Sequence, residues 1–167
     1  MGGVSIHGAE IAGFGGLLKL VDMDRVALRN LGVSEFIIRH LEKHDLGSPL
    51  GFRCQPPLYW ESSPIAKRGF IPLWECGTML WYFNPQTKTF ENCSLEDIDD
   101  VRHKYVSLQS VLAELVLELY EDETEIGELR GLAESAGFRH VDRLLAEAEK
   151  NRDSYREWRD GFPATCS

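Results

Sequence analysis

The strongest constraint on the fold is a run of apolar side chains at helical spacing in the second half of the chain. They recur every three or four residues, at Leu108, Val111, Leu112, Leu115, Val116 and Leu119. Residues at this spacing lie on one face of an α-helix. Ser107 precedes the run, and a serine at this position can cap the first helical turn. The pattern predicts a long helix, opened by Ser107, that buries its apolar face.

Prolines exclude a continuous helix from the middle of the chain. Six of the seven prolines lie between residues 49 and 85, and proline disrupts a helix interior. Short strands and loops are therefore predicted here, with candidate strands at Leu58–Trp60, Phe70–Leu73, Thr78–Phe83 and Lys88–Asn92. The last two flank Asn84-Pro85-Gln86-Thr87, a loop short enough for an antiparallel hairpin. We expect the buried side of this sheet to carry Trp81, Phe83 and Phe90.

Three further helices are predicted from capping residues and apolar spacing. Ser34 can cap a helix over residues 34–45, with Gly47 as its stop signal. Another spans about residues 125–136 and ends at Gly137, which suits a left-handed glycine cap. The last is expected to run without a break from about residue 141 to 159, because one stripe carries Val141, Leu144, Leu145, Ala148, Tyr155 and Trp158.

Residue types that commonly carry chemistry form no recognisable site in the sequence. The four cysteines, at positions 54, 76, 93 and 166, include no CxxC pair, so zinc is not expected and we interpret them as free thiols. No nucleophile signature surrounds Cys76 or Cys93. His40 and His44 share a helix face without an HExxH pattern, which favours a solvated face. We therefore expect no catalytic residue, no metal and no cofactor.

The sequence carries no signal for a membrane. Its longest apolar runs are a few residues, far short of the roughly 18 needed to cross a bilayer. The N-terminus MGGVSIHGAE lacks the basic and apolar regions of a secretory signal, so a cytoplasmic location is the expectation. The first twenty residues are rich in glycine but lack the GxGxxG spacing of a phosphate-binding loop. We expect a flexible arm or a short turn there.

Negative charge gathers in the second half of the chain. The net charge is −9, and residues 1–90 carry 9 Lys and Arg against 8 Asp and Glu, while residues 91–167 carry 9 against 19. Between Tyr105 and Leu129 there is no Lys or Arg, and carboxylates occur at Glu114, Glu118, Glu121, Asp122, Glu123, Glu125 and Glu128. Such a field repels nucleic acid and anionic membranes and attracts basic proteins.

Two interpretations of this acidic stretch are open. It can be a solvated face that aids solubility, or a surface for a positively charged partner protein. For the second, the candidate partner-binding residues are Glu114, Glu118, Glu121, Asp122, Glu123 and Glu125. Trp60 and Trp74 are candidate aromatic contacts for the same partner, with burial in the core as the alternative.

The order of these elements resembles the SUKH superfamily, which groups fungal cell-wall-synthesis regulators with many bacterial immunity proteins. VSEFIIRHLEKHDLGSPLGF is similar to the family's first helix and glycine turn, GFIPLWECGTMLWYFNPQTKTF to its central strand pair, and YVSLQSVLAELVLELYED to its late helix. Together these segments cover about residues 30–123. The chain departs from the family pattern where Asp45-Leu46-Gly47 stands for NGG and where Leu108 replaces the usual Phe.

The resemblance implies an α+β fold with a central, mostly antiparallel β-sheet flanked by helices. Residues 124–167 lie outside the family pattern, and we expect them to form a helical C-terminal extension. Residues 1–123 would form the SUKH-like domain, on which residues 124–167 pack. It also implies a non-catalytic immunity protein that binds and neutralises a cognate toxin. Many such toxins are nucleases, whose basic grooves carboxylates would complement. The alternative is a regulatory or scaffold adaptor that binds an endogenous partner through C-terminal helices around Leu144, Tyr155 and Trp158.

Overall fold

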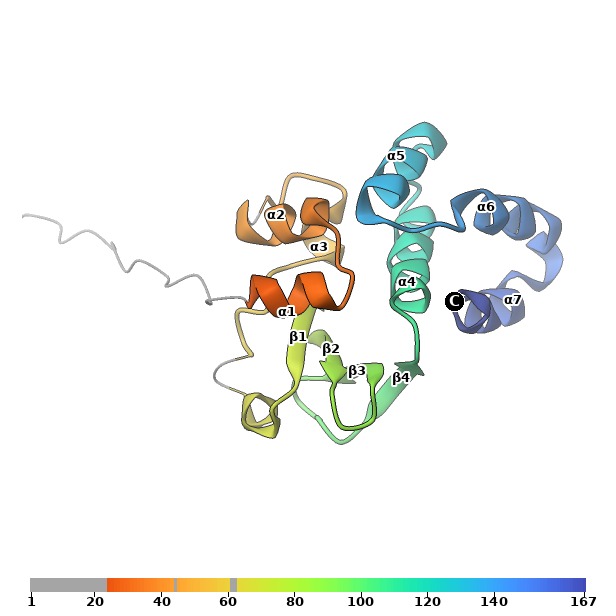
Figure 1. Ribbon diagram of the computed structural model, residues 1–167. Coiled ribbons are helices and arrows are strands. Elements are labelled where there is room, and N and C mark those ends of the chain that lie inside the picture. The colour runs from red at the N-terminus through yellow and green to blue at the C-terminus, as the bar shows by residue number, and fades with distance from the viewer. Residues whose placement is uncertain (1–23, 44, 61–62) are drawn as a thin grey trace, which may run out of the picture.

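A four-stranded antiparallel sheet lies at the centre of the chain, with helices before and after it (Figure 1). The computed structural model describes residues 24–43, 45–60 and 63–167. The elements are α1 (Arg25–Asn30), α2 (Glu35–Lys43), α3 (Leu50–Arg53), β1 (Ile71–Cys76), β2 (Met79–Asn84), β3 (Thr89–Ser94), β4 (Val101–Tyr105), α4 (Leu108–Glu121), α5 (Ile126–Ala136), α6 (Val141–Lys150) and α7 (Tyr155–Gly161). The predicted α+β class is confirmed. The expected N-terminal arm lies outside the described residues.

Each strand of the sheet pairs with the next along the chain, in the order β1-β2-β3-β4. The predicted hairpin is confirmed, because β2 and β3 pair with Phe83 opposite Phe90 across a turn at residues 85–88. The predicted strand at Leu58–Trp60 is wrong, since these residues form a turn. Strand β4 was not predicted from the sequence. Its side chains are all exposed or half-exposed, so it lacks the apolar alternation of a half-buried strand.

The two faces of the sheet belong to different cores. The larger core joins strand residues Trp81 and Phe90 to the apolar sides of the helices, while a smaller one on the other face packs around Tyr82. Trp74 is 1 % exposed in the larger core and Trp60 is 7 % exposed in the smaller one. The structure thus corrects the suggestion that these two tryptophans contact a partner, because both side chains are buried and offer a partner almost no accessible area.

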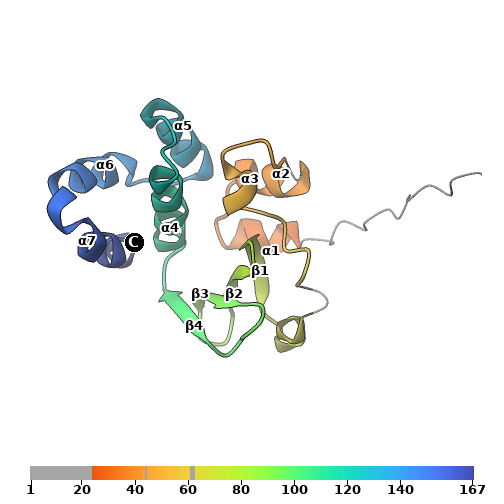
Figure 2. The same ribbon diagram turned by 180° about the vertical axis from the view of Figure 1, so that it is seen from behind.

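Helix α4 is the central helix of the fold. The side chain of Ser107 caps it, accepting a hydrogen bond from the backbone N–H of Gln109 at 3.0 Å. Ten of its fourteen residues are buried, rather than the single face that the apolar spacing predicts. Figure 1 and Figure 2 show the reason: α4 runs between the α1–α3 helices on one side and the α6–α7 pair on the other. Both sides of this helix therefore contribute to the core.

Removal of the α4 cap should destabilise the fold. Ser107→Ala is expected to lower the free energy of unfolding by about 1 kcal/mol, because the N–H of Gln109 loses its partner in the first turn. Urea denaturation followed by tryptophan fluorescence measures the change. Ser135→Ala, on the exposed face of α5, is the control and should have little effect. Equal stability of the Ser107→Ala variant and the wild type would contradict the capping role.

The predicted fourth helix is wrong as a single element. It is interrupted after α6 at Asn151, whose side-chain amide and backbone N–H both donate to the carbonyl of Glu147, and a short 3₁₀ turn leads into α7. The break lets the end of the chain pack against α4, where the Ser110 hydroxyl donates to the carbonyl of Cys166 at 2.7 Å. Phe162 joins the same core as the strands. None of the described helices has the length and apolar character needed to span a membrane.

Candidate functional site

The acidic residues on α4 lie at spacings of three to four, so they share one side of the helix. Part of that side faces β4, α3 and α7. Glu114, in the middle of the helix, is only 3 % exposed, whereas Glu121 near the end is exposed. The predicted acidic surface is therefore divided by the structure into a buried part and an exposed part. Glu114 in particular is corrected from a surface contact to an interior carboxylate.

Arg159 of α7 neutralises the buried part. Its guanidinium lies 2.8 Å from Glu114 and 3.2 Å from Glu121. The Tyr105 hydroxyl donates a second hydrogen bond to Glu114 at 2.6 Å, and the His103 ring nitrogen lies 3.6 Å from the same carboxylate. A buried charge is tolerated only when it is paired and hydrogen-bonded. Arg159 provides the counter-charge for Glu114, and Arg159 and Tyr105 both donate hydrogen bonds to its carboxylate.

Arg53 of α3 forms the second arginine contact with α4. It donates two hydrogen bonds of 2.7 Å to the two carboxylate oxygens of Asp122, which is the bidentate geometry that arginine favours. These bonds hold the pKa of Asp122 below its usual value. The same guanidinium is 3.9 Å from Glu118. Two of the predicted surface carboxylates, Glu121 and Asp122, are thus engaged in internal ion pairs.

A cavity of about 240 Å³ lies between these two arginines, and we term it the α4 cavity. Its lining includes Arg53, Arg159, Cys76, Glu118 and Trp81. Burial raises the pKa of Glu118 to about 7, although the charge of Arg53 acts in the opposite direction. Burial also raises the pKa of the Cys76 thiol. The thiolate that nucleophilic chemistry needs is therefore disfavoured at Cys76, while the raised pKa of Glu118 lies near neutral pH.

The exposed carboxylates gather where α4 ends and α5 begins. We term Glu123, Glu125 and Glu128 the acidic corner. All three are exposed, and none forms an ion pair with a residue that the structure describes. Glu125 also caps α5, since its carboxylate accepts from the N–H of Glu128 at 3.0 Å. Hydrogen bonds from the N–H groups of Gly127 and Glu128 lower the pKa of Glu125, which favours the charged form of this carboxylate.

Within the described residues, no three His, Cys, Asp or Glu side chains are arranged to hold a metal ion. The four cysteines are all free thiols. His40 lies on α2, where its Nε2 donates to the carbonyl of Cys54 at 3.1 Å, and the position of its predicted neighbour His44 is outside the description. The arginine–carboxylate contacts around α4 therefore remain as the candidate site.

Comparison of the chain with protein-family models, curated proteins and solved structures finds no significant match. The site must be interpreted from its own geometry. The sequence located the carboxylates but missed Arg53 and Arg159, which are 69 and 45 residues from their partners Asp122 and Glu114. No local signal marks these two arginines, because each acts only after distant segments meet.

Proposed function

We propose that this protein is a non-catalytic immunity protein that binds a basic partner, a cognate toxin domain, and neutralises it. The observation that carries the proposal is the acidic corner, where three exposed carboxylates at a short helix–helix connection form no ion pair with a described residue. The similarity of residues 30–123 to the SUKH pattern supports the toxin as the class of partner. A nuclease toxin would fit best, because its phosphate-binding groove is basic.

The acidic corner suits partner binding better than the rest of the acidic stretch. Glu114, Glu121 and Asp122 already hold Arg159 and Arg53, so a partner would have to compete with internal ion pairs. Carboxylates that keep their charge and exposure instead accelerate encounter with a basic partner and add to its affinity. Glu123 and Glu128 have a further advantage as probes, because no described hydrogen bond or ion pair in the fold uses either side chain.

Charge reversal at the corner tests this surface. Glu123→Lys combined with Glu128→Lys should weaken partner binding at least about tenfold at low salt, because two attractive charges become repulsive. The control is Glu134→Lys with Glu157→Lys, which changes the net charge equally at exposed positions elsewhere. Titration calorimetry with the captured partner measures both variants. Equal weakening in both would indicate a general field effect, and unchanged affinity in the first would remove the corner from the interface.

The partner itself can be identified by capture. The tagged protein is incubated with lysate of its native cells at low and at high salt, and the bound polypeptides are identified by mass spectrometry. Recovery of one basic polypeptide in near-stoichiometric amount, released by salt, is the expected result. Its toxicity in the absence of the tagged protein then tests neutralisation. Recovery of several regulatory proteins that salt does not release would favour an adaptor.

The alternative adaptor function depends on side chains that pack inside the fold. Leu144 is in the main core, and Trp158 packs against that core and donates to Glu147 at 3.0 Å. The Tyr155 ring packs beside those of Trp158 and Tyr120. Deletion of residues 138–167 would remove core residues together with Arg159, so it would test stability rather than adaptor binding. The immunity function is therefore the better supported of the two proposals.

A further inference from the structure

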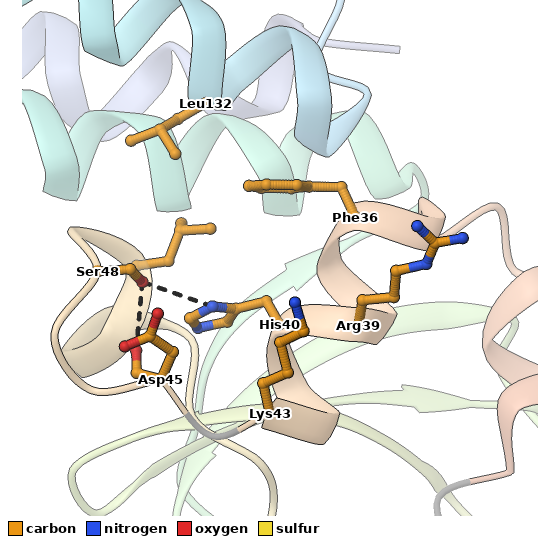
Figure 3. Close-up of a pocket in the computed structure, with 8 residues that line it drawn as sticks. Phe36, Arg39, His40, Lys43, Asp45, Ser48 and Leu132 are labelled. Carbon is orange, nitrogen blue, oxygen red and sulfur yellow. Dashed lines mark hydrogen bonds between the residues drawn. The ribbon is translucent and has the colours of Figure 1, made fainter.

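A hollow of about 500 Å³ lies between α2, the α2–α3 connection and α5 (Figure 3). We term it the α2–α5 hollow. Four of its lining residues are Phe36, Arg39, His40 and Lys43, which follow the i, i+3, i+4, i+7 spacing of one stripe along α2. Figure 3 shows Leu132 entering from α5 on the opposite side. This volume lies within the roughly 300–1,000 Å³ of typical small-molecule sites.

The acidic and basic residues of α2 have different contacts. Its acidic residues Glu35 and Glu42 pair with Arg29 and Arg25 of α1. Its basic residues Arg39 and Lys43 line the hollow instead. These two cations are four residues apart, an arrangement of like charges that costs helix stability. Neither forms an ion pair with any residue in the described part of the chain. In a protein with a net charge of −9, this stripe is a local positive site.

The interior of the hollow is largely apolar. Leu50 of α3 is buried at its base, and Phe36 and Leu132 contribute apolar surface from α2 and α5. The acidic group at the rim, Asp45, is used locally, because its carboxylate accepts from the N–H of Gly47 at 3.0 Å. The hollow therefore combines apolar walls with two cations at its edge that form no ion pair among the described residues, although Arg39 interacts electrostatically with Glu35.

We propose that the α2–α5 hollow binds a small amphipathic carboxylate. The apolar body of the ligand packs between Phe36 and Leu132, and its carboxylate pairs with Arg39 and Lys43. Charge-assisted bonds from two cations favour an anion over a neutral molecule of the same shape. The imidazole of His40 also lines the hollow. Its Nε2 donates a hydrogen bond to the carbonyl of Cys54, and its Nδ1 lies 3.5 Å from the hydroxyl oxygen of Ser48. This site is separate in chemistry from the acidic corner, and the proposal does not depend on the toxin partner.

The test compares two probes of matched shape, 2-naphthoate and the neutral 2-naphthamide. The wild-type protein should bind one equivalent of 2-naphthoate, with NMR shift changes centred on the His40 ring and the Leu132 methyl groups. Binding of 2-naphthamide should be at least about tenfold weaker. Arg39→Glu with Lys43→Glu should weaken 2-naphthoate binding at least about tenfold as well.

The matched control is Lys150→Glu with Arg156→Glu, two exposed cations that likewise form no ion pair with described residues. The control changes the net charge identically and should leave 2-naphthoate binding nearly unchanged. Arg39→Gln with Lys43→Gln provides a milder variant if the charge reversal impairs folding, which circular dichroism would reveal. Equal affinity for the two probes, equal loss in the control, shifts centred elsewhere, or no binding at millimolar 2-naphthoate would each overturn the proposal.

Discussion

Replacing Arg159 with methionine is expected to lower the free energy of unfolding by about 3–5 kcal/mol, because the change leaves Glu114 buried without its counter-charge. Glu114 is 3 % exposed, so water cannot replace the guanidinium. Among the described residues, the Tyr105 hydroxyl remains as a hydrogen-bond donor to Glu114, and the His103 ring nitrogen lies 3.6 Å away. Methionine keeps most of the volume of the arginine stem, so the experiment removes charge more than packing. Urea denaturation at pH 7.5, followed by tryptophan fluorescence, measures the loss.

Two further variants separate the ion pair from other causes. Arg156→Met, on the exposed face of α7, should have little effect, because Arg156 forms no ion pair with described residues. Combining Arg159→Met with Glu114→Gln should restore at least half of the lost stability, since a neutral amide no longer needs a counter-charge and can still accept from Tyr105. A loss below about 1 kcal/mol in the single Arg159→Met variant would show that Glu114 is not held as a buried charge.

The stability of the protein should fall as the pH rises from about 5 to 8. Burial raises the pKa of both Glu118 and Glu75 to about 7 in the folded state. Each pKa is above the ordinary value of a glutamate, so the folded state binds more protons in this window and loses stability as these protons dissociate. The loss amounts to roughly 3 kcal/mol at most for each carboxyl group. The lowered pKa values of Glu91 and Asp122 have the opposite sign but act at lower pH.

The variant Glu118→Gln isolates one of the two groups. It should be more stable than the wild type by about 2–3 kcal/mol at pH 8 and nearly equal to it at pH 5, because an amide does not ionise. Urea denaturation at a series of pH values measures both profiles. Glu134→Gln, at an exposed position of α5, should keep the wild-type profile. Parallel profiles for Glu118→Gln and the wild type would contradict the raised pKa of Glu118.

The acidic corner and the α2–α5 hollow differ in how far the sequence foretold them. The corner follows from a stretch that has carboxylates and no Lys or Arg, although the sequence could not separate it from the buried Glu114. The hollow was not foreseen. The basic stripe of α2 lies in the same segment as Glu35 and Glu42, so the sequence shows a segment of balanced charge. Only the structure shows that Glu35 and Glu42 form ion pairs with arginines of α1.

Local interactions explain what the sequence determined by itself. Helices α2, α4 and α5 and the β2–β3 hairpin depend on spacing, capping and turn residues that are neighbours in the chain, as Ser107 and Gly137 illustrate. The break at Asn151 was missed because apolar spacing continued through it, and β4 was missed because a strand at the sheet edge needs little apolar surface.

Tertiary structure alone decided the electrostatics of the site. Arg53 and Arg159 reach α4 from α3 and α7, and the resulting contacts turn a uniform acidic stretch into a buried ion pair at Glu114, a raised pKa at Glu118 and an exposed corner at Glu123. The sequence specifies where each carboxylate lies along the chain. Its solvation and its counter-charge depend on segments that meet only in the folded chain, and these two properties set its pKa and its availability to a partner.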